Sequence, residues 1–339
     1  MKKLLPVVLF SFCFNLIAQD RFNKDDVFVK RRTCYSVKDS SLITGIVEYF
    51  HSNGQKKEEI SYKDGIKHGH FKAWDEEGHI KSEKNYKNKK RHGAFRDWHK
   101  VKYGVKPNTL KKEMFYKDNE KDSTYTSWFG NGNIKEQQQY DMGLRIGVFK
   151  RFHSNGQLFS EVHFDSTGQQ NGSSNQWYPN GQMMNKMTMV NDVPDGLAQE
   201  WYEDGQLKNE MTYKLGKFHG ELKRWNKEGE ILYETTFYNG TGVNKTFSSN
   251  DKIMHEGSLV EGMKDGTHKY WYDNGTLMRE ENYVNGSREG SFKSWDKDGN
   301  LTGERNYLNG KKHGIWRSWS KDGTLEFEEE YLNNRKVRK

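Results

Sequence analysis

The sequence predicts an all-β protein, an elongated single-layer antiparallel meander of about twelve 24-residue β-hairpin repeats. Four alanines against 33 glycines, with 14% aromatic residues, disfavour helices and favour strands and turns. An apolar fraction of 32% is too low for one large central core, and the aromatic content argues against disorder. The third observation is a glycine–aromatic pattern that recurs about every 24 residues, which is typical of stacked repeats.

The first eighteen residues have the pattern of a secretory signal peptide. Two lysines precede the apolar run 4–17, and the small residue Ala18 follows it. The alternative is an uncleaved membrane anchor, but the run is short for a membrane span, and Ser11 and Asn15 interrupt it. We therefore expect residues 1–18 to be removed and the protein to be exported, to the periplasm, the outer envelope or the extracellular space.

Three further regions follow the signal segment. Residues 19–40 are less regular and are expected to form an N-terminal leader, either a strand or a loose arm. The repeat array covers residues 41–334, and residues 335–339 form a basic tail whose charge would discourage edge-to-edge pairing of strands. Without residues 1–18 the chain keeps only Cys34, so neither an internal disulfide nor a cysteine metal site is expected.

Each repeat starts at a glycine, with one serine as the exception, and we number this residue as position 0. Position 5 is always aromatic, position 9 is usually glycine, position 11 is usually aliphatic and position 17 is usually tyrosine. One longer spacing comes from six extra residues around Tyr103–Asn108. The twelve starts are Gly45, Gly69, Gly93, Ser123, Gly147, Gly172, Gly196, Gly220, Gly242, Gly266, Gly290 and Gly314.

Two turns divide each repeat into two short antiparallel strands. Positions 8 and 9 often read Asn-Gly or Asp-Gly, as in Asp204-Gly205, which predicts a two-residue type I′ turn with positive φ at both residues. A second glycine turn, such as Asn285-Gly286, follows position 17. A single hairpin is not stable alone, so we expect neighbouring hairpins to stack and to share an aromatic stripe as their core.

A two-residue turn at positions 8 and 9 places position 3 directly opposite position 14. Position 3 is basic in eight repeats, and all eight carry glutamate at position 14, which indicates cross-strand ion pairs. The same register places Trp201 opposite Lys208 and Trp225 opposite Leu232. The predicted pairs are Lys72–Glu83, Arg96–Glu113, Lys150–Glu161, Lys223–Glu234, Lys245–Glu256, Lys269–Glu280, Lys293–Glu304 and Arg317–Glu328.

Repeats such as Gly196–Tyr213 and Gly314–Tyr331 resemble MORN repeats, in particular the variant class with a longer second strand. That class is similar to the bacterial proteins labelled YwqK-type antitoxins. The resemblance covers nearly the whole chain after the signal segment. It implies an elongated β-hairpin scaffold that contacts proteins or membranes and has no chemistry of its own.

We predict no catalytic, cofactor-binding or metal-binding residue, no cofactor, and no enzyme activity. Four histidines lie directly before a repeat start, and the repeat spaces them along the array, which does not favour a metal site; they are His68, His92, His219 and His313. Glycine-rich segments lack the strand–loop–helix context of a phosphate site. We also see no irregular segment large enough to form an enzyme pocket.

The sequence leaves the binding residues and the partner open. Basic charge interleaved with aromatics can indicate nucleic acid, but the basic residues at position 3 face glutamates and export is expected, so we expect no nucleic acid. Local basic excess at Lys87–Arg91 and Lys100–Lys112 is compatible with contact to the anionic lipid of a membrane surface or to an acidic partner, although charge runs of this kind are more often solvated loops. The first hypothesis is an exported scaffold that binds another protein, with an antitoxin-like or immunity-like role as one version. The alternative is a membrane-surface or cell-wall-associated structural protein.

Overall fold

The computed structural model describes residues 19–102, 105 and 108–337, and the predicted signal segment 1–18 lies outside this range. The described part of the chain divides into two compact units, which run from residue 19 to 134 with 140–143 and from 135 to 139 with 144–337. Strand β11 (Ile134–Asp141) contributes to both units. Among the described residues, none of the helical segments is long and apolar enough to span a membrane.

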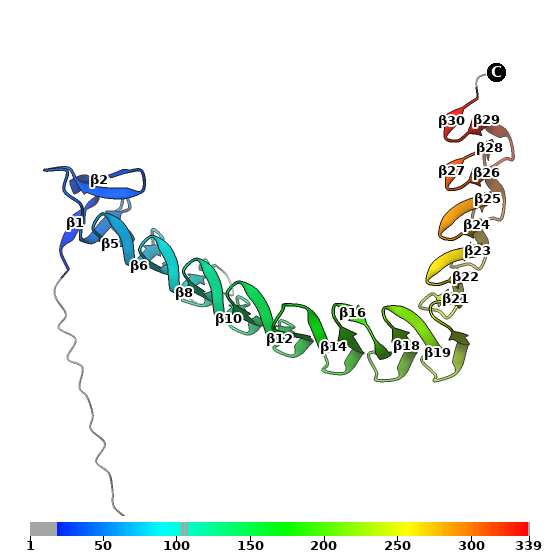
Figure 1. The fold of residues 1–339 in the computed structure, drawn as a ribbon, viewed down its shortest axis with the longest axis horizontal. Coiled ribbons are helices and arrows are strands. Elements are labelled where there is room, and N and C mark those ends of the chain that lie inside the picture. The colour runs from blue at the N-terminus through cyan, green and yellow to red at the C-terminus, as the bar shows by residue number, and fades with distance from the viewer. Residues whose placement is uncertain (1–18, 103–104, 106–107, 338–339) are drawn as a thin grey trace, which may run out of the picture. The chain divides into compact units, whose positions relative to one another are not determined.

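The first unit begins with an ordered leader that precedes the hairpins (Figure 1). The leader elements are β1 (Arg21–Asn23), the 3₁₀ turn η1 (Lys24–Asp26), β2 (Val27–Lys30) and β3 (Thr33–Ser36). The following strands are β4 (Gly45–Phe50), β5 (Lys56–Lys63), β6 (Ile66–Trp74), β7 (Ile80–Lys87), β8 (Lys90–Trp98), β9 (Leu110–Lys117) and β10 (Glu120–Trp128). Each of these strands pairs antiparallel with the next.

The second unit is likewise an antiparallel meander, and the strands of the two units together confirm the predicted all-β fold of β-hairpin repeats. Its first strands are β12 (Leu144–Phe152), β13 (Leu158–Phe164), β14 (Gln170–Trp177), β15 (Met183–Val190), β16 (Val193–Pro194), β17 (Gly196–Trp201), β18 (Leu207–Lys214), β19 (Lys217–Trp225) and β20 (Ile231–Phe237). The remaining strands are β21 (Gly242–Phe247), β22 (Ile253–Val260), β23 (Met263–Trp271), β24 (Leu277–Val284), β25 (Ser287–Trp295), β26 (Leu301–Leu308), β27 (Lys311–Lys312), β28 (Gly314–Trp319), β29 (Leu325–Leu332) and β30 (Arg335–Lys336).

The meander of the second unit is interrupted once, which the sequence analysis did not anticipate. Strand β21 starts a separate sheet and is not hydrogen-bonded to β20. Three residues usually separate the glycine of the second turn from the next repeat start, as between Gly216 and Gly220, but only Thr241 separates Gly240 from Gly242. The short stretch that would pair β21 with β20 is therefore missing.

The turn at positions 8 and 9 is not the predicted type I′ turn. Gly205 has φ 91° whereas Asp204 does not have a positive φ, and the Asp204 carboxylate accepts the Gln206 amide at 2.9 Å. The aspartate side chain thus stabilises a type I turn, and only the glycine enters the left-handed region, as in three-residue hairpin loops.

This turn shifts the register next to it, so the predicted tryptophan pairs are wrong. Trp201 faces Leu207 instead of Lys208 because the strand bulges between Glu200 and Trp201. In the same way, the next repeat places Trp225 opposite Ile231 instead of Leu232. The bulge adds one residue to the second strand, and the pairing returns to the predicted register beyond it.

Residues with positive φ form a type I′ turn at the second turn and a β-bulge at the start of most repeats. Asn285 and Gly286 have φ 48° and 80°, which identifies the second turn as type I′. The start glycine lies in a bulge opposite the previous strand, and Gly69, for example, has φ 90°. Ser123 occupies the same place with φ 67°, so one repeat holds a non-glycine residue in a left-handed conformation.

All eight predicted ion pairs are confirmed, in register and in contact. The two residues of every pair are cross-strand partners. Their N–O distances lie between 2.6 Å for Arg96–Glu113 and 3.6 Å for Lys293–Glu304. Each exposed pair contributes on the order of 0.2–1 kcal/mol to the stability, so the ion pairs stabilise the array through many small contributions.

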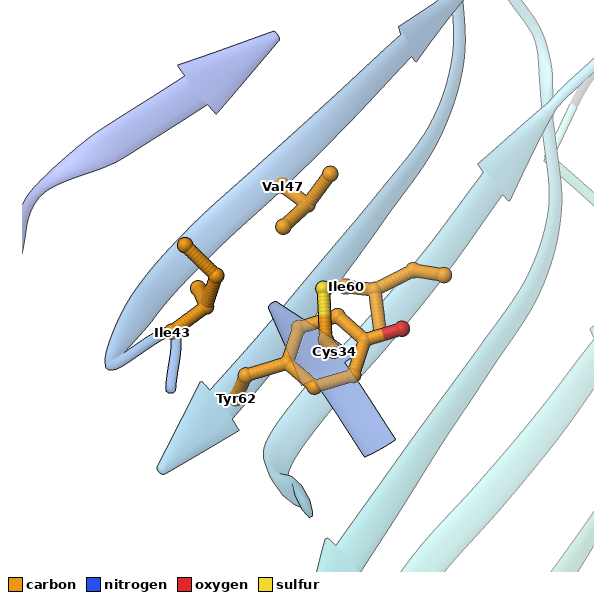
Figure 2. Packing of buried hydrophobic residues seen from close by; sticks show 5 residues of the cluster. All are labelled: Cys34, Ile43, Val47, Ile60 and Tyr62. Carbon is orange, nitrogen blue, oxygen red and sulfur yellow. The ribbon is translucent and has the colours of Figure 1, made fainter. Parts of the chain in front are cut away.

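The leader is an ordered part of the first hairpin and not a loose arm. Cys34 of β3 packs with Ile43, Val47, Ile60 and Tyr62 in the hydrophobic cluster of the first unit (Figure 2). Strand β1 pairs in parallel with β4. The leader therefore covers the apolar face that the first repeat would otherwise expose.

Candidate functional site

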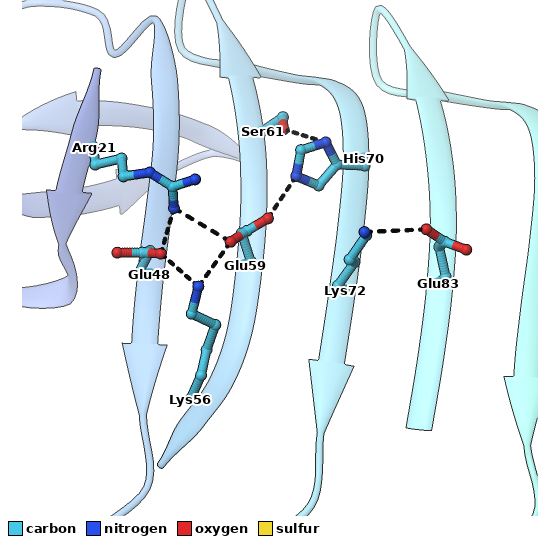
Figure 3. Close-up of polar contacts among 8 residues, drawn as sticks. All are labelled: Arg21, Glu48, Lys56, Glu59, Ser61, His70, Lys72 and Glu83. Carbon is cyan, nitrogen blue, oxygen red and sulfur yellow. Dashed lines mark hydrogen bonds and ion pairs between the residues drawn. The ribbon is translucent and has the colours of Figure 1, made fainter. Parts of the chain in front are cut away.

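The leader also completes the charge pattern of the first repeat (Figure 3). Here position 3 is Glu48 and faces Glu59, so two carboxylates are opposed. Arg21 of β1 contacts Glu48 at 2.5 Å, and Lys56 contacts Glu48 and Glu59 at 2.7 and 3.0 Å. Burial would raise the pKa of Glu59, but hydrogen bonds from Lys56 and His70 outweigh it and lower the pKa to about 2. The cations thus keep the Glu59 carboxylate ionised.

The ion pairs extend from one hairpin to the next. Glu83 contacts Lys72 of its own hairpin at 3.4 Å and Arg96 of the following hairpin at 3.2 Å. Glu304 lies in the same way between Lys293 and Arg317. Because the charges on this face neutralise one another, the face offers little net charge to a ligand.

A second set of cations stacks on aromatic rings, and the sequence analysis missed it. Seven repeats carry a lysine or arginine two residues before their start, and each of these cations lies over the aromatic ring at position 17 of the same repeat. The distances range from 4.3 Å for Arg91–Tyr116 to 5.8 Å for Lys67–Tyr86. The other pairs are Lys121–Tyr140, Arg145–Phe164, Lys264–Tyr283, Arg288–Tyr307 and Lys312–Tyr331. Such contacts contribute about 0.5–1 kcal/mol when exposed and explain how a core can form with so few aliphatic residues.

Position 6 and the turn asparagine join consecutive repeats, which also escaped the sequence analysis. Tyr202 donates its hydroxyl to the carbonyl of Trp225, one repeat further on, at 3.0 Å. Asn274 donates its side-chain amide to the carbonyl of Lys297 in the next turn at 2.8 Å. The recurrence of His or Tyr directly after the position-5 aromatic was the available signal.

Three of the four histidines before the repeat starts, His68, His92 and His219, contact the second turns of the array. His68 hydrogen-bonds the Asn88 side chain at 3.1 Å, and His219 accepts the Asn239 amide at 3.3 Å. These histidines are spaced along the array, as the sequence analysis expected. Their contacts are part of the stacking between turns.

Among the residues that the structure describes, one group of side chains has ligand atoms close enough together to hold a metal ion. Asp75, Glu77 and His79 have such atoms within 4.8 Å of one another. However, the Asp75 carboxylate already accepts the backbone amides of Glu77 and His79 at 3.2 and 2.8 Å. This geometry is that of a turn closed by an aspartate.

In the first unit, a hollow of about 690 Å³ is lined mainly by residues of β6, β7, β8 and β9, although no enzyme pocket was expected from the sequence. Its lining includes Trp98, His99, Lys112, Asp97 and Glu77, so both signs of charge are present. Lys112 is neutralised by Asp97 at 3.1 Å. Lys100, Lys111 and Lys112 of the basic segment therefore line a surface of mixed charge.

The other basic segment, Lys87–Arg91, lies at a more strongly basic place. A pocket of about 450 Å³ is lined by Val29 and Arg32 of the leader, by Tyr62 of β5 and Lys67 of β6 on either side of the first repeat's second turn, and by Lys89 of the next repeat's second turn. No acidic residue lines this pocket. Within the described residues, Arg32, Lys67 and Lys89 form no ion pair.

In the second unit, the edge formed by the second turns exposes apolar side chains. Position 18, the residue before each turn, is lysine in the first three repeats and mostly apolar in the second unit. We call this row the apolar edge. Its members are at least 37% exposed, and they are Val190, Tyr238, Val260, Val284, Leu308 and Leu332.

The family model described as "MORN repeat variant" matches nine segments that together cover more than half of the chain. The segments are residues 43–64, 67–88, 121–142, 145–166, 170–191, 194–215, 264–285, 288–309 and 312–333. No curated protein matches the sequence.

Two solved structures show distant similarity. One is described as the crystal structure of TcdB2-TccC3-Cdc42, with 10% identity and a TM-score of 0.17 over 89% of this chain and 20% of that chain. The other is the Photorhabdus luminescens Tc holotoxin pore, with 10% identity, a TM-score of 0.16 and the same two coverages. The chain spans about a fifth of the length of either, and at these TM-scores neither similarity bears on the fold or the function.

The repeat period, the turn residues and the nine matched segments agree with one another. MORN repeats are non-enzymatic scaffolds that commonly mediate contacts with proteins or membrane lipids. The chain belongs to the MORN repeat variant family.

Proposed function

We propose that the protein is an exported, non-catalytic scaffold that binds another protein along the turn edge of its hairpin array. The apolar edge of the second unit carries this proposal, because a row of exposed apolar side chains that recurs with the repeat is typical of a protein contact surface. A neutralising, antitoxin-like role is one form that such binding takes.

Binding through the apolar edge is tested by capture and then by direct titration. The mature chain 19–339 is immobilised and offered an envelope and secreted-protein extract, and a retained protein is purified and titrated. We expect retention at high salt, since apolar contacts are not screened. The triple variant Val284→Ser, Leu308→Ser, Leu332→Ser should lose the partner. The control Lys214→Ser changes the same repeat position where it is already polar, and should bind normally.

Two results would contradict the proposal. The first is a triple variant that binds the purified partner as tightly as the parent. The second is retention of lipid or cell-wall fragments alone, lost at high salt, which would favour the surface-structural alternative. Export is tested separately, by sequencing the N-terminus of the protein from its source, and we expect it to begin at Gln19.

A further inference from the structure

The basic pocket of the first unit belongs to a larger surface, which we call the basic edge and define as residues 30–32, 63–67 and 87–91. These three turns carry nine lysines or arginines and a single carboxylate, that of Asp64. In the equivalent turns of the second unit, position 18 is mostly apolar and each turn carries at most two lysines or arginines. We infer that the basic edge binds an acidic segment of a partner protein, with a carboxylate side chain held in the pocket.

The backbone holds the three turns of the basic edge together. The Cys34 amide of the leader donates to the Gly65 carbonyl at 2.8 Å, and the Lys89 amide donates to the Lys67 carbonyl at 2.9 Å. A Cβ atom on Gly65 would lie 2.8 Å from the Cys34 carbonyl oxygen, so the close approach of leader and turn requires glycine there. The pocket is therefore formed in advance of binding, which lowers the entropic cost of association.

The leader turn carries its arginines at a conformational cost. Arg31 and Arg32 form its two central residues, with φ 49° and 65°. The left-handed region costs about 1–2 kcal/mol for a residue with a side chain, and Asn-Gly is the pair that suits such a turn. Every other two-residue turn with two positive φ values in the described chain has Asn, Asp or Gly in at least one of these places. Strained residues that persist at one site suggest a role beyond folding.

The charges of the pocket remain available to a ligand. The Lys67 ammonium lies 5.7 Å from the centre of the Phe71 ring and 5.8 Å from that of Tyr86, and such contacts leave its charge in place. Arg32 and Lys89 have no carboxylate partner among the described residues. Three cations without a carboxylate around one pocket therefore favour an anionic guest.

The form of the edge favours an extended peptide. Successive hairpins are about 10 Å apart, which is two strand spacings, and an extended chain covers this distance in about three residues. Val29 and the Tyr62 ring give the pocket two less polar walls, against which the methylenes of a glutamate can pack. An acidic chain with a carboxylate at every third residue would meet one basic turn after another.

The inference rests on the proposed function, protein binding, and a peptide titration tests it. The full mature chain is titrated with a fluorescein-labelled twelve-residue peptide that has glutamate at every third position, and with the same peptide carrying glutamines. We expect the glutamate peptide to bind at least about tenfold more tightly, as charge-assisted hydrogen bonds imply, and to weaken as salt rises. Equal binding of the two peptides would overturn the inference.

The decisive variant combines Arg31→Asn, Arg32→Gly and Lys89→Gly. It converts both turns to Asn-Gly, since residue 88 is already asparagine, so the melting temperature should stay the same or rise while glutamate-specific binding is lost. The matched control is Lys214→Gln with Lys217→Gln, which flank a turn of the second unit and should leave binding unchanged. A triple variant that binds like the parent would contradict the inference.

Two further outcomes separate this inference from the proposed function. Binding to vesicles with 30% phosphatidylglycerol, but not to the glutamate peptide, would replace the acidic peptide with a lipid surface. A captured partner that the decisive variant retains and the apolar-edge variant loses would leave the proposed function standing without this inference. If the parent chain retained no protein partner in the capture experiment, both the proposed function and this inference would be refuted.

Discussion

Two hairpins of the array follow the same register and bury opposite chemistry at the same two positions. In β4–β5, Val47 at position 2 faces Ile60 at position 15, whereas in β23–β24 the same positions hold His268 and Glu281. All four side chains are at most 6% exposed. The repeat therefore specifies which positions are buried and leaves the polarity of those positions to the neighbouring residues.

The polar pair is surrounded by polar and charged groups from its own and adjacent strands. Glu281 accepts from the Tyr283 hydroxyl at 2.5 Å and lies 2.8 and 3.1 Å from the Nε atoms of Arg279 and Arg288. His268 Nε2 must donate to the Ser258 carbonyl at 2.9 Å, so its Nδ1 accepts from His255, 3.0 Å away. The apolar pair needs only the leader packed against it, whereas the polar pair depends on several partners at once.

The largest expected effect comes from removing one partner of the buried cluster. Glu281→Ala should destabilise the second unit by about 3–5 kcal/mol, because it leaves the groups around it without their carboxylate. Unfolding monitored by hydrogen exchange of β22–β24 would measure this loss.

The control for this change is the pair found in the first hairpin. His268→Val with Glu281→Ile should recover most of the lost stability, since replacing a whole buried polar pair by apolar residues is often neutral. Equal losses from the single and the double change would show that the two hairpins are not interchangeable at these positions.

The next largest expected effect is a difference between the two hairpins in how their stability depends on pH. Burial and the neighbouring His268 and Lys264 lower the pKa of His255 to about 4. Because protonation is disfavoured in the fold, the stability of β22–β24 should be constant above about pH 6.5 and fall between pH 6.5 and 4. For the first hairpin, the pKa of Glu59 is lowered to about 2, so its contribution is lost only between about pH 4.5 and 2.

Hydrogen exchange at pH 5 measures this difference. Protection of β22–β24 should be reduced relative to pH 7, and protection of β4–β5 should be retained. His255→Gln keeps a donor toward His268 and removes the titrating group, so it should flatten the response of β22–β24. An equal loss of protection in both hairpins would contradict the comparison.

A smaller effect distinguishes an isolated ion pair from one that belongs to a row. Lys150 and Glu161 pair with each other, and Glu161 faces the neutral Asn175 on the following strand. Exchanging these two residues should leave the melting temperature nearly unchanged, while either single reversal should lower it. The same exchange of Lys223 and Glu234 should lower the melting temperature, because residue 223 also faces Glu210. Thermal unfolding of the six variants tests this. An unchanged melting temperature after the exchange of Lys223 and Glu234 would contradict the claim that residue 223 also interacts with Glu210.

The sequence predicts most of this fold because its signals are local and repeated. The eight ion pairs follow from one register rule, and that rule holds wherever the strand is regular. It fails at Trp201 because a turn aspartate accepts a backbone amide and makes the turn one residue longer, and a side-chain hydrogen bond of this kind leaves the spacing of the sequence unchanged. The leader turn at Arg31-Arg32 could not be predicted from the sequence either, because arginine does not favour the left-handed conformation that both residues adopt.

The candidate sites were less predictable than the fold. The segment Lys87–Arg91 was recognised as basic, but its pocket depends on the leader, which is distant in the sequence and has no repeat pattern. The buried His268 was hidden for another reason: the space for its ring comes from Gly257 on the neighbouring strand, where a Cβ atom would lie 2.1 Å from His268 Nδ1. The large side chain in one repeat and the glycine in the neighbouring repeat compensate each other, so both positions depart from the repeat pattern of the sequence.

The smallest expected effect concerns Ser123, the one repeat start without glycine. Its φ of 67° lies in the left-handed region, where glycine carries no Cβ penalty, although glycine also loses more entropy on folding. Ser123→Gly should therefore stabilise the first unit by only about 0.5–1 kcal/mol, and Ser123→Val should destabilise it because a branched side chain suits this region least. The reverse change at an equivalent start, Gly290→Ser with φ 72°, should cost a similar amount in the second unit. Chemical denaturation of the three variants measures these shifts. Equal stability of the parent and Ser123→Gly would mean that the greater entropy of glycine in the unfolded chain cancels the strain of serine in the fold. The bulge would then tolerate any residue that can adopt a left-handed conformation.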